Sequence, residues 1–198
     1  MTLHLWLAGY RDALQQQGHT FLDSIIAQDF FYEHDKGILK YPEINFEQLV
    51  EDARAYVFSH LEDLQLYPGA VETIASLDEH TVRLSLVSSS SRQLVEAGLT
   101  KFNLLHYFDS IICGDDVTKH KPDPEAFRQT LENVGMLPHE TLIIGDARTD
   151  ILAGKAAGTY TCLFTPADNA LFYDFTELRA AEPDYCISTL ADVLSIMI

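Results

Sequence analysis

The sequence predicts an α/β fold in which a parallel sheet carries helices on both faces, together with a smaller domain built of helices. Residues 1–65 show only the helical spacing of apolar residues, whereas residues 66–198 alternate short apolar runs with amphipathic stretches. Strands that alternate with helices form parallel sheets, because each crossover returns the chain to the same end of the sheet. We therefore expect a helical domain over residues 1–65 and an α/β domain over residues 66–198.

The helices of the first domain follow from spacing and from end signals. The predicted helices span residues 2–17, 20–28 and 45–64. Asn45 is the expected N-cap of the last of these, because its side chain can accept a hydrogen bond from the first turn. Residues 29–44 are expected to be irregular, because Gly37 and Pro42 interrupt them.

The α/β domain is expected to alternate strands and helices from residue 82 onward. The predicted strands span residues 82–87, 108–114, 140–146, 160–164 and 183–188. The predicted helices span residues 91–99, 123–135, 149–158 and 189–197. In open parallel sheets, ligands bind beyond the carboxyl ends of the strands, so functional residues are sought there.

The acidic composition argues against nucleic-acid and membrane partners. With 13 Lys and Arg against 30 Asp and Glu, the formal net charge is −17, and such a surface repels phosphate backbones and anionic lipid headgroups. We expect no nucleic-acid partner and no membrane partner. The three cysteines lack zinc-binding spacing and predict free core thiols in a reducing compartment. No signal peptide and no membrane-spanning apolar run are recognisable, so a cytoplasmic location is expected.

Serines fill the connection between the first predicted strand and the helix that follows it. Ser88 and Ser89 stand at the carboxyl end of that strand. Backbone N–H groups at a helix start, combined with a hydroxyl, make an anion site. Serines are also good turn formers and helix caps, so a purely structural role is the alternative.

A lysine stands in the motif Lys-Pro-Asp-Pro, between the second and the third predicted strands. Pro122 and Pro124 stiffen the backbone, and a lysine held on such a turn can neutralise a phosphate as a point charge. Lys121 is therefore the candidate cation. The alternative is a solvated lysine ahead of a helix.

Two carboxylates follow the third predicted strand. Asp146 ends that strand, and Asp150 comes one helical turn later. Mg²⁺ is held in proteins by one or two carboxylates together with waters and substrate phosphates, so this pair is the candidate metal site. Gly145 is expected to leave room for close approach. The alternative is that the two acids cap the helix that follows them.

These residues come in the order of the motifs of the haloacid dehalogenase-like hydrolase superfamily, which the chain resembles over essentially its whole length. Ser88 matches the second motif, Lys121 the third, and Asp146 with Asp150 the fourth. The stretches LYPGAVETIASL and YFDSIICGDDVTKHKPDPEAF are typical of the branch with a helical cap, which includes phosphoglycolate phosphatases and β-phosphoglucomutases. The resemblance implies a Rossmann-like core, with residues 1–65 as the cap.

The resemblance also implies an activity, that of a Mg²⁺-dependent phosphatase of small organic phosphates such as phosphoglycolate or sugar phosphates. In the family, an aspartate attacks phosphorus to form an aspartyl-phosphate, and a second aspartate two residues later acts as acid and then as base. The catalytic residues that it implies are Ser88, Lys121, Asp146 and Asp150. The substrate-binding residues that it implies are Ser88, Ser89, Lys121 and His4, the last of which matches a position near the cap hinge.

The chain departs from the family in the first motif, Asp-x-Asp, which carries both of these aspartates. No such motif stands ahead of the cap, and MTLHLW begins where the loop of that motif ends in relatives. We therefore expect an N-terminally truncated chain that lacks the first core strand. Such a chain is expected to be poorly stable and inactive by itself.

Other functions remain open on the sequence. One alternative is a non-catalytic binding or regulatory protein that keeps the fold, and another is a β-phosphoglucomutase-like phosphotransferase. The expected partner is a small phosphorylated metabolite, and the chain is expected to be a monomer or a homodimer. Candidates for contacting the leaving group from the cap are His4, Glu33, His34, Lys36 and Lys40.

Overall fold

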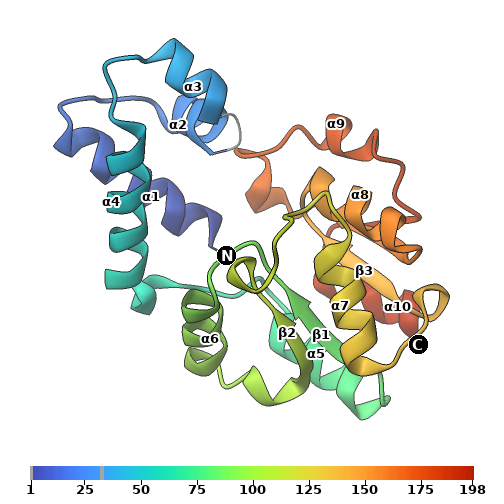
Figure 1. Cartoon of the computed structure of the whole chain (residues 1–198). Helices are drawn as coiled ribbons and strands as arrows, with labels where there is room; N and C mark the ends of the chain where they lie inside the picture. Colours follow the sequence, from blue (N-terminus) through green and yellow to red (C-terminus); the bar gives the residue numbers. More distant parts are fainter. Residues whose placement is uncertain (1, 32–33) are drawn as a thin grey trace. The chain divides into compact units, whose positions relative to one another are not determined.

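The computed structural model describes the backbone of residues 2–31 and 34–198, and the chain divides into two compact units (Figure 1). The first unit comprises Met1–Leu66 and Leu171–Tyr173, and the second comprises Tyr67–Ala170 and Asp174–Ile198. This division differs from the expected domains mainly in one segment. Leu171–Tyr173 joins the first unit because the Phe172 side chain is packed in the hydrophobic core of that unit.

The described residues of the first unit form helices and no strand. The helices are α1 (Leu3–Gln16), α2 (Asp23–Phe30), α3 (His34–Lys40) and α4 (Phe46–Ser59). Asn45 caps α4 as expected, because its side chain accepts a hydrogen bond from the N–H of Gln48 at 3.2 Å. α1 packs along α4, and a Cβ added at Gly9 would lie 2.8 Å from the carbonyl oxygen of Ala53.

The expectation that residues 29–44 are irregular is wrong in part, because α3 forms within them. Gly37 is buried inside α3, where an added Cβ would lie 2.5 Å from the Asp29 carbonyl oxygen and 3.1 Å from the Phe46 ring. Glycine is a poor helix former, so close packing and not helix propensity decides this element.

Strands and helices alternate in the second unit in the predicted order. The strands are β1 (Leu84–Val87), β2 (Phe108–Ile112), β3 (Leu142–Gly145), β4 (Tyr160–Phe164) and β5 (Tyr185–Ile187). The helices are α5 (Ala70–Glu79), α6 (Arg92–Lys101), α7 (Glu125–Val134), α8 (Arg148–Ala157), α9 (Phe175–Arg179) and α10 (Leu194–Met197). Every strand pairing is parallel, as the alternation predicts.

The described strands form two sheets instead of one. β1 pairs with β2, and β4 pairs with β3 on one side and β5 on the other. Leu84 of β1 and Leu142 of β3 nevertheless pack against the same hydrophobic cluster, which includes Cys162 and Val193. In the described residues no strand pairs with the second edge of β1 or of β3, which is where the resemblance puts the first core strand.

The cysteines differ from expectation at one position. Cys113 and Cys162 are buried, but Cys186 of β5 is exposed, so the expectation of three core thiols is wrong for Cys186. It lies on the outer strand of its sheet, where the side chains are less covered. Among the described helices, none is long and apolar enough to cross a membrane.

Candidate functional site

Ser88 follows β1 directly and takes part in the turn that leads to α6. Its N–H donates to the carbonyl oxygen of Ile112 at 2.9 Å, and its hydroxyl oxygen accepts from the N–H of Ser90 at 3.1 Å. Ser89 is exposed, and its carbonyl oxygen lies against Gly114, where a Cβ would not fit. Ser88 therefore makes the turn contacts of the structural alternative, while its O–H remains able to donate to a ligand.

Lys121 and Asp150 form a buried ion pair, although 29 positions separate them in the chain. The Lys121 Nζ lies 2.6 Å from Asp150 Oδ1, and the two side chains are only 12% and 9% exposed. The other carboxylate oxygen, Oδ2, accepts the N–H of Ala147 at 3.1 Å, at the start of α8. Both oxygens of Asp150 thus accept one hydrogen bond each, which fixes the carboxylate between Lys121 and the start of α8.

Gly145 makes room for a protein side chain and not for a ligand. A Cβ added at this last residue of β3 would collide with the Asp150 side chain, which folds back over the strand end. The absence of a side chain at Gly145 therefore allows Asp150 to reach both Lys121 and the N–H of Ala147.

Asp146 follows β3, and its pKa is shifted by its surroundings. Burial, and then the nearby charge of Asp150, raise the pKa of Asp146 to about 6, although the Lys121 charge and a hydrogen bond from Asn169 act in the opposite direction. The Asn169 amide donates to Asp146 Oδ2 at 3.0 Å. Part of the side chain remains accessible to solvent.

The donor set at Asp146 fits a hard divalent cation. A carboxylate offers about four lone-pair positions, so the single side-chain donor Asn169 leaves room for a metal ion. Mg²⁺ needs only one or two protein carboxylates, because waters and substrate phosphates fill its other positions. Burial and the charge of Asp150 disfavour the ionised form of Asp146, and a nearby positive charge would stabilise that form.

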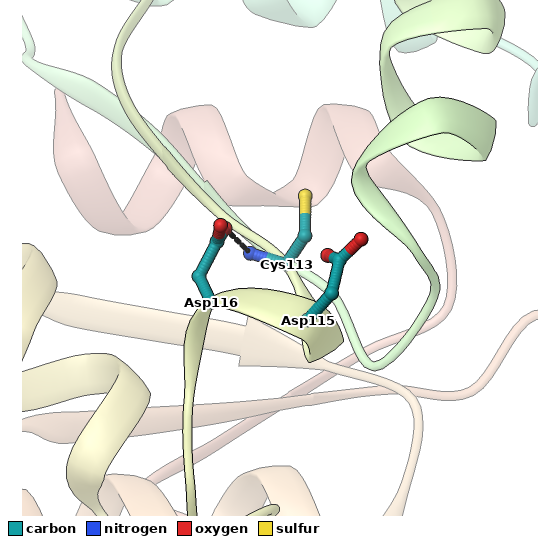
Figure 2. A group of neighbouring side chains, drawn as sticks. All are labelled: Cys113, Asp115 and Asp116. Atoms are coloured by element: carbon teal, nitrogen blue, oxygen red, sulfur yellow. Dashed lines mark hydrogen bonds between the residues drawn. The ribbon is translucent and has the colours of Figure 1, made fainter.

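A second group of possible metal ligands, Cys113, Asp115 and Asp116, is already used to hold a loop (Figure 2). Asp116 accepts the backbone N–H of Cys113 at 2.7 Å and pairs with the Arg92 guanidinium at 2.5 Å. Asp115 accepts the backbone N–H of Arg92 at 2.9 Å, at the start of α6. The bonds from Arg92 and Cys113 lower the pKa of Asp116, and together with the bond to Asp115 they explain the cluster without a metal ion.

His4 lies on α1 and belongs to the first unit, whereas the predicted site residues Ser88, Ser89, Lys121, Asp146 and Asp150 belong to the second. Its ring packs edge-on against Phe172, with 5.0 Å between the centroids. Of the other cap candidates, Lys40 pairs with Asp29 at 2.6 Å. Glu33 lies outside the described residues, as do the side chains of His34 and Lys36.

The structure brings two further residues to the site that the sequence did not single out. Asn169 contacts Asp146, and the Tyr67 hydroxyl donates to Asn169 Oδ1 at 2.9 Å. Tyr67 belongs to the YPGA turn and Asn169 to a stretch for which the sequence suggested no role. Asparagine is common in turns, so its type and position carried no signal of a functional contact.

Comparisons with known proteins agree with the motifs. Residues 2–164 match the family described as haloacid dehalogenase-like hydrolase. The pyrophosphatase PpaX of Halalkalibacterium halodurans is 31% identical over 190 residues, which cover 96% of this chain and 80% of the relative.

Two solved structures share the fold over nearly all of the chain. A predicted phosphoglycolate phosphatase from Haemophilus somnus 129PT gives a TM-score of 0.82 at 21% identity, covering 100% of this chain and 92% of the other. A HAD family hydrolase from Deinococcus radiodurans R1 was solved with bound phosphate and sodium. It gives a TM-score of 0.82 at 18% identity, covering 98% of this chain and 87% of the other.

Proposed function

Because this chain belongs to the haloacid dehalogenase-like hydrolases, we propose that it serves as a Mg²⁺-dependent phosphatase of small organic phosphates. The observation that carries the proposal is the buried Lys121–Asp150 pair next to Asp146 at the end of β3. We further propose a cytoplasmic monomer or homodimer. Pyrophosphate and phosphoglycolate, after which two of the similar proteins are named, are the first compounds to test.

Each residue of the site has a separate role in this proposal. Asp146 offers the carboxylate for Mg²⁺, and Lys121 places a positive charge against a phosphate oxygen. Asp150 holds Lys121 in position, and Ser88 offers its hydroxyl as a donor. The chemistry that Mg²⁺ supplies when bound is neutralisation of the charge on the phosphoryl group.

The nucleophile is the part of the machinery that the sequence does not supply. No Asp-x-Asp occurs anywhere in the 198 residues. In the family's reaction, a carboxylate oxygen bonds to phosphorus while the bond to the leaving oxygen breaks, and that oxygen takes a proton from the second aspartate. We propose that the chain turns over substrate only when a segment with this motif is joined to it.

Phosphate release from p-nitrophenyl phosphate, pyrophosphate and phosphoglycolate in the presence of Mg²⁺ tests the proposal. The 198-residue chain is assayed beside a longer form in which a segment with the Asp-x-Asp motif is joined ahead of Met1. Turnover is expected in the longer form alone. In that form Lys121→Ala should abolish it, while Lys119→Ala, at a lysine that is 70% exposed, should leave it unchanged.

Other results would favour other functions. Turnover by the 198-residue chain alone would overturn the assignment of the nucleophile. Phosphate binding without turnover in either form would favour a non-catalytic binding or regulatory protein. Transfer of the phosphoryl group to a sugar phosphate in preference to water would favour a phosphotransferase.

A further inference from the structure

We propose that Asn169 is a positioning residue for Asp146 and that Tyr67 fixes the orientation of Asn169. The three side chains form one hydrogen-bonded chain within the second unit. Asn169 orients the carboxylate to which the proposed function assigns the metal ion, so this inference rests on that function. It assigns a role to the stretch after β4, which none of the family motifs covers.

The Asn169 side chain is buried, and each end of its amide makes a hydrogen bond. Its side chain is among the most buried polar side chains, at 1% exposure. Its Nδ2 lies 3.0 Å from Asp146 Oδ2, and its Oδ1 lies 2.9 Å from the Tyr67 hydroxyl oxygen. A buried amide with both ends bonded has one favoured orientation, because turning it over would lose both hydrogen bonds.

Chemistry fixes the direction of this chain of hydrogen bonds. An ionised carboxylate only accepts, so Asn169 must present its NH₂ group to Asp146 and its carbonyl oxygen to Tyr67. The Tyr67 hydroxyl must then donate. Burial, followed by the charge of Asp146, raises the pKa of Tyr67 to about 12, so the hydroxyl keeps its proton at neutral pH.

Tyr67 and Asn169 are each held in place by further contacts. The Tyr67 ring packs edge-on against Phe164 of β4, with centroids 5.0 Å apart. The N–H of Asn169 donates to the carbonyl oxygen of Pro166 at 3.0 Å, and the N–H of Thr165 donates to Ile187 of β5 at 2.9 Å. The amide that reaches Asp146 is therefore anchored to the sheet and is not carried on a free loop.

Groups that bond the unused oxygen of a metal-binding carboxylate fix its plane and support its affinity. Without the Asn169 amide, Asp146 could rotate, and its Oδ2 would lose its side-chain donor. We therefore expect Asn169→Ala to weaken metal binding about 10- to 100-fold, which is the usual effect of losing such a partner. Tyr67→Phe removes only the hydroxyl and should weaken binding by a smaller factor in the same direction.

The test measures binding of Mn²⁺, as a stand-in for Mg²⁺, by electron paramagnetic resonance on the 198-residue chain. Wild type, Asn169→Ala, Tyr67→Phe and Asp146→Ala are compared, each with its thermal unfolding curve. Thr161→Val is the matched control, because Thr161 is also a buried polar residue and the change removes its side-chain hydrogen bond to Asp184 at 2.8 Å, at the opposite end of β4. The control should lose stability and keep its metal affinity.

The outcomes separate this inference from the proposed function. If Asp146→Ala abolishes binding while Asn169→Ala binds like wild type, the positioning role is wrong and the metal site stands. If Asp146→Ala binds like wild type, the metal site itself is wrong and the inference falls with it. If Asn169→Ala does not fold, Tyr67→Phe decides, and unchanged affinity in that variant would reject the inference.

Discussion

At the scale of single residues, Asp146 is a carboxyl whose burial works against its ionised form. Its pKa, raised to about 6, is higher in the folded protein than in the unfolded chain, so the folded protein binds the proton more tightly. The stability that this provides is fully present below the ordinary aspartate pKa of about 4 and is lost as the pH rises through about 6. Ionised Asp146 is therefore destabilising in the metal-free protein at neutral pH.

Asp146→Asn should consequently stabilise the metal-free protein at pH 7.5, on the order of 1–2 kcal/mol once the solvent-accessible part of the side chain is allowed for. Denaturant unfolding in the presence of EDTA measures this. The difference between variant and wild type should disappear near pH 4, where both side chains are neutral. A variant that is less stable than wild type at both pH values would contradict the assignment.

The Lys121–Asp150 pair leads to a second prediction at this scale. Removing one partner of a buried pair leaves an uncompensated charge and typically costs about 3–5 kcal/mol. With side chains 12% and 9% exposed, Lys121→Met should approach that loss. Lys121→Met combined with Asp150→Asn should recover part of it, because the buried charge is then removed as well.

A double-mutant cycle from denaturant unfolding gives the coupling energy of this pair. A coupling close to zero would mean that solvent screens the two charges, in disagreement with their burial. Lys119→Ala serves as the control, since that lysine is 70% exposed and lies 3.9 Å from Asp123.

At the scale of elements, the junction of β3 with α8 depends on the missing side chain of Gly145. Because a Cβ there would meet Asp150, Gly145→Ala should displace the Asp150 carboxylate, lower stability and weaken metal binding at Asp146. Gly69→Ala is the contrasting variant, because Gly69 has φ +76° with nothing within 4 Å of an added Cβ. It should cost about 1–2 kcal/mol of backbone strain and leave metal binding unchanged.

Thermal unfolding and Mn²⁺ titration of the two glycine variants distinguish these effects. Equal metal affinity in both would show that Asp150 does not need the space over Gly145. The junction of β3 with α8 would then not depend on Gly145, although the ion pair between Lys121 and Asp150 could remain.

At the scale of the whole molecule, β4 is the one strand of the second unit that has a partner on both sides among the described residues, whereas β1 and β3 each have one edge without a partner. β4 is paired on both sides, and Thr161, Cys162 and Leu163 are 0% exposed. β3 is paired on one side, and its Ile144 remains 40% exposed. Burying one large apolar side chain is worth about 1.5–3 kcal/mol, a large part of a total stability of about 5–15 kcal/mol.

Hydrogen exchange should therefore be slow in β4 and much faster in β1 and β3 of the 198-residue chain. In a form to which a segment with the Asp-x-Asp motif is joined ahead of Met1, protection of β1 and β3 should rise toward that of β4. Hydrogen exchange detected by mass spectrometry measures the protection of each strand in the two forms. Equal protection of all strands in the shorter chain would contradict the expectation that it is poorly stable.

The sequence by itself determined the five strands, their order and most of the helices, but it did not predict α3, α5 or α9. β4 has the predicted bounds of residues 160–164, and Gly135, at φ +66°, ends α7 as expected. The sequence also marked Ser88, Lys121 and Asp146 as candidates at strand ends. These features are set by apolar periodicity and by the residues at the ends of helices and strands. Such signals lie within a few consecutive residues, so they can be recognised in the sequence alone.

Only the tertiary structure decided which distant side chains meet. Lys121 bonds Asp150, and Asn169 bonds Asp146, across 29 and 23 positions of the chain. Phe172 packs in the core of the first unit, although the chain on both sides of Leu171–Tyr173 belongs to the second unit. Close packing and the need to satisfy buried polar groups select such partners in space, and no local pattern of residues records that selection.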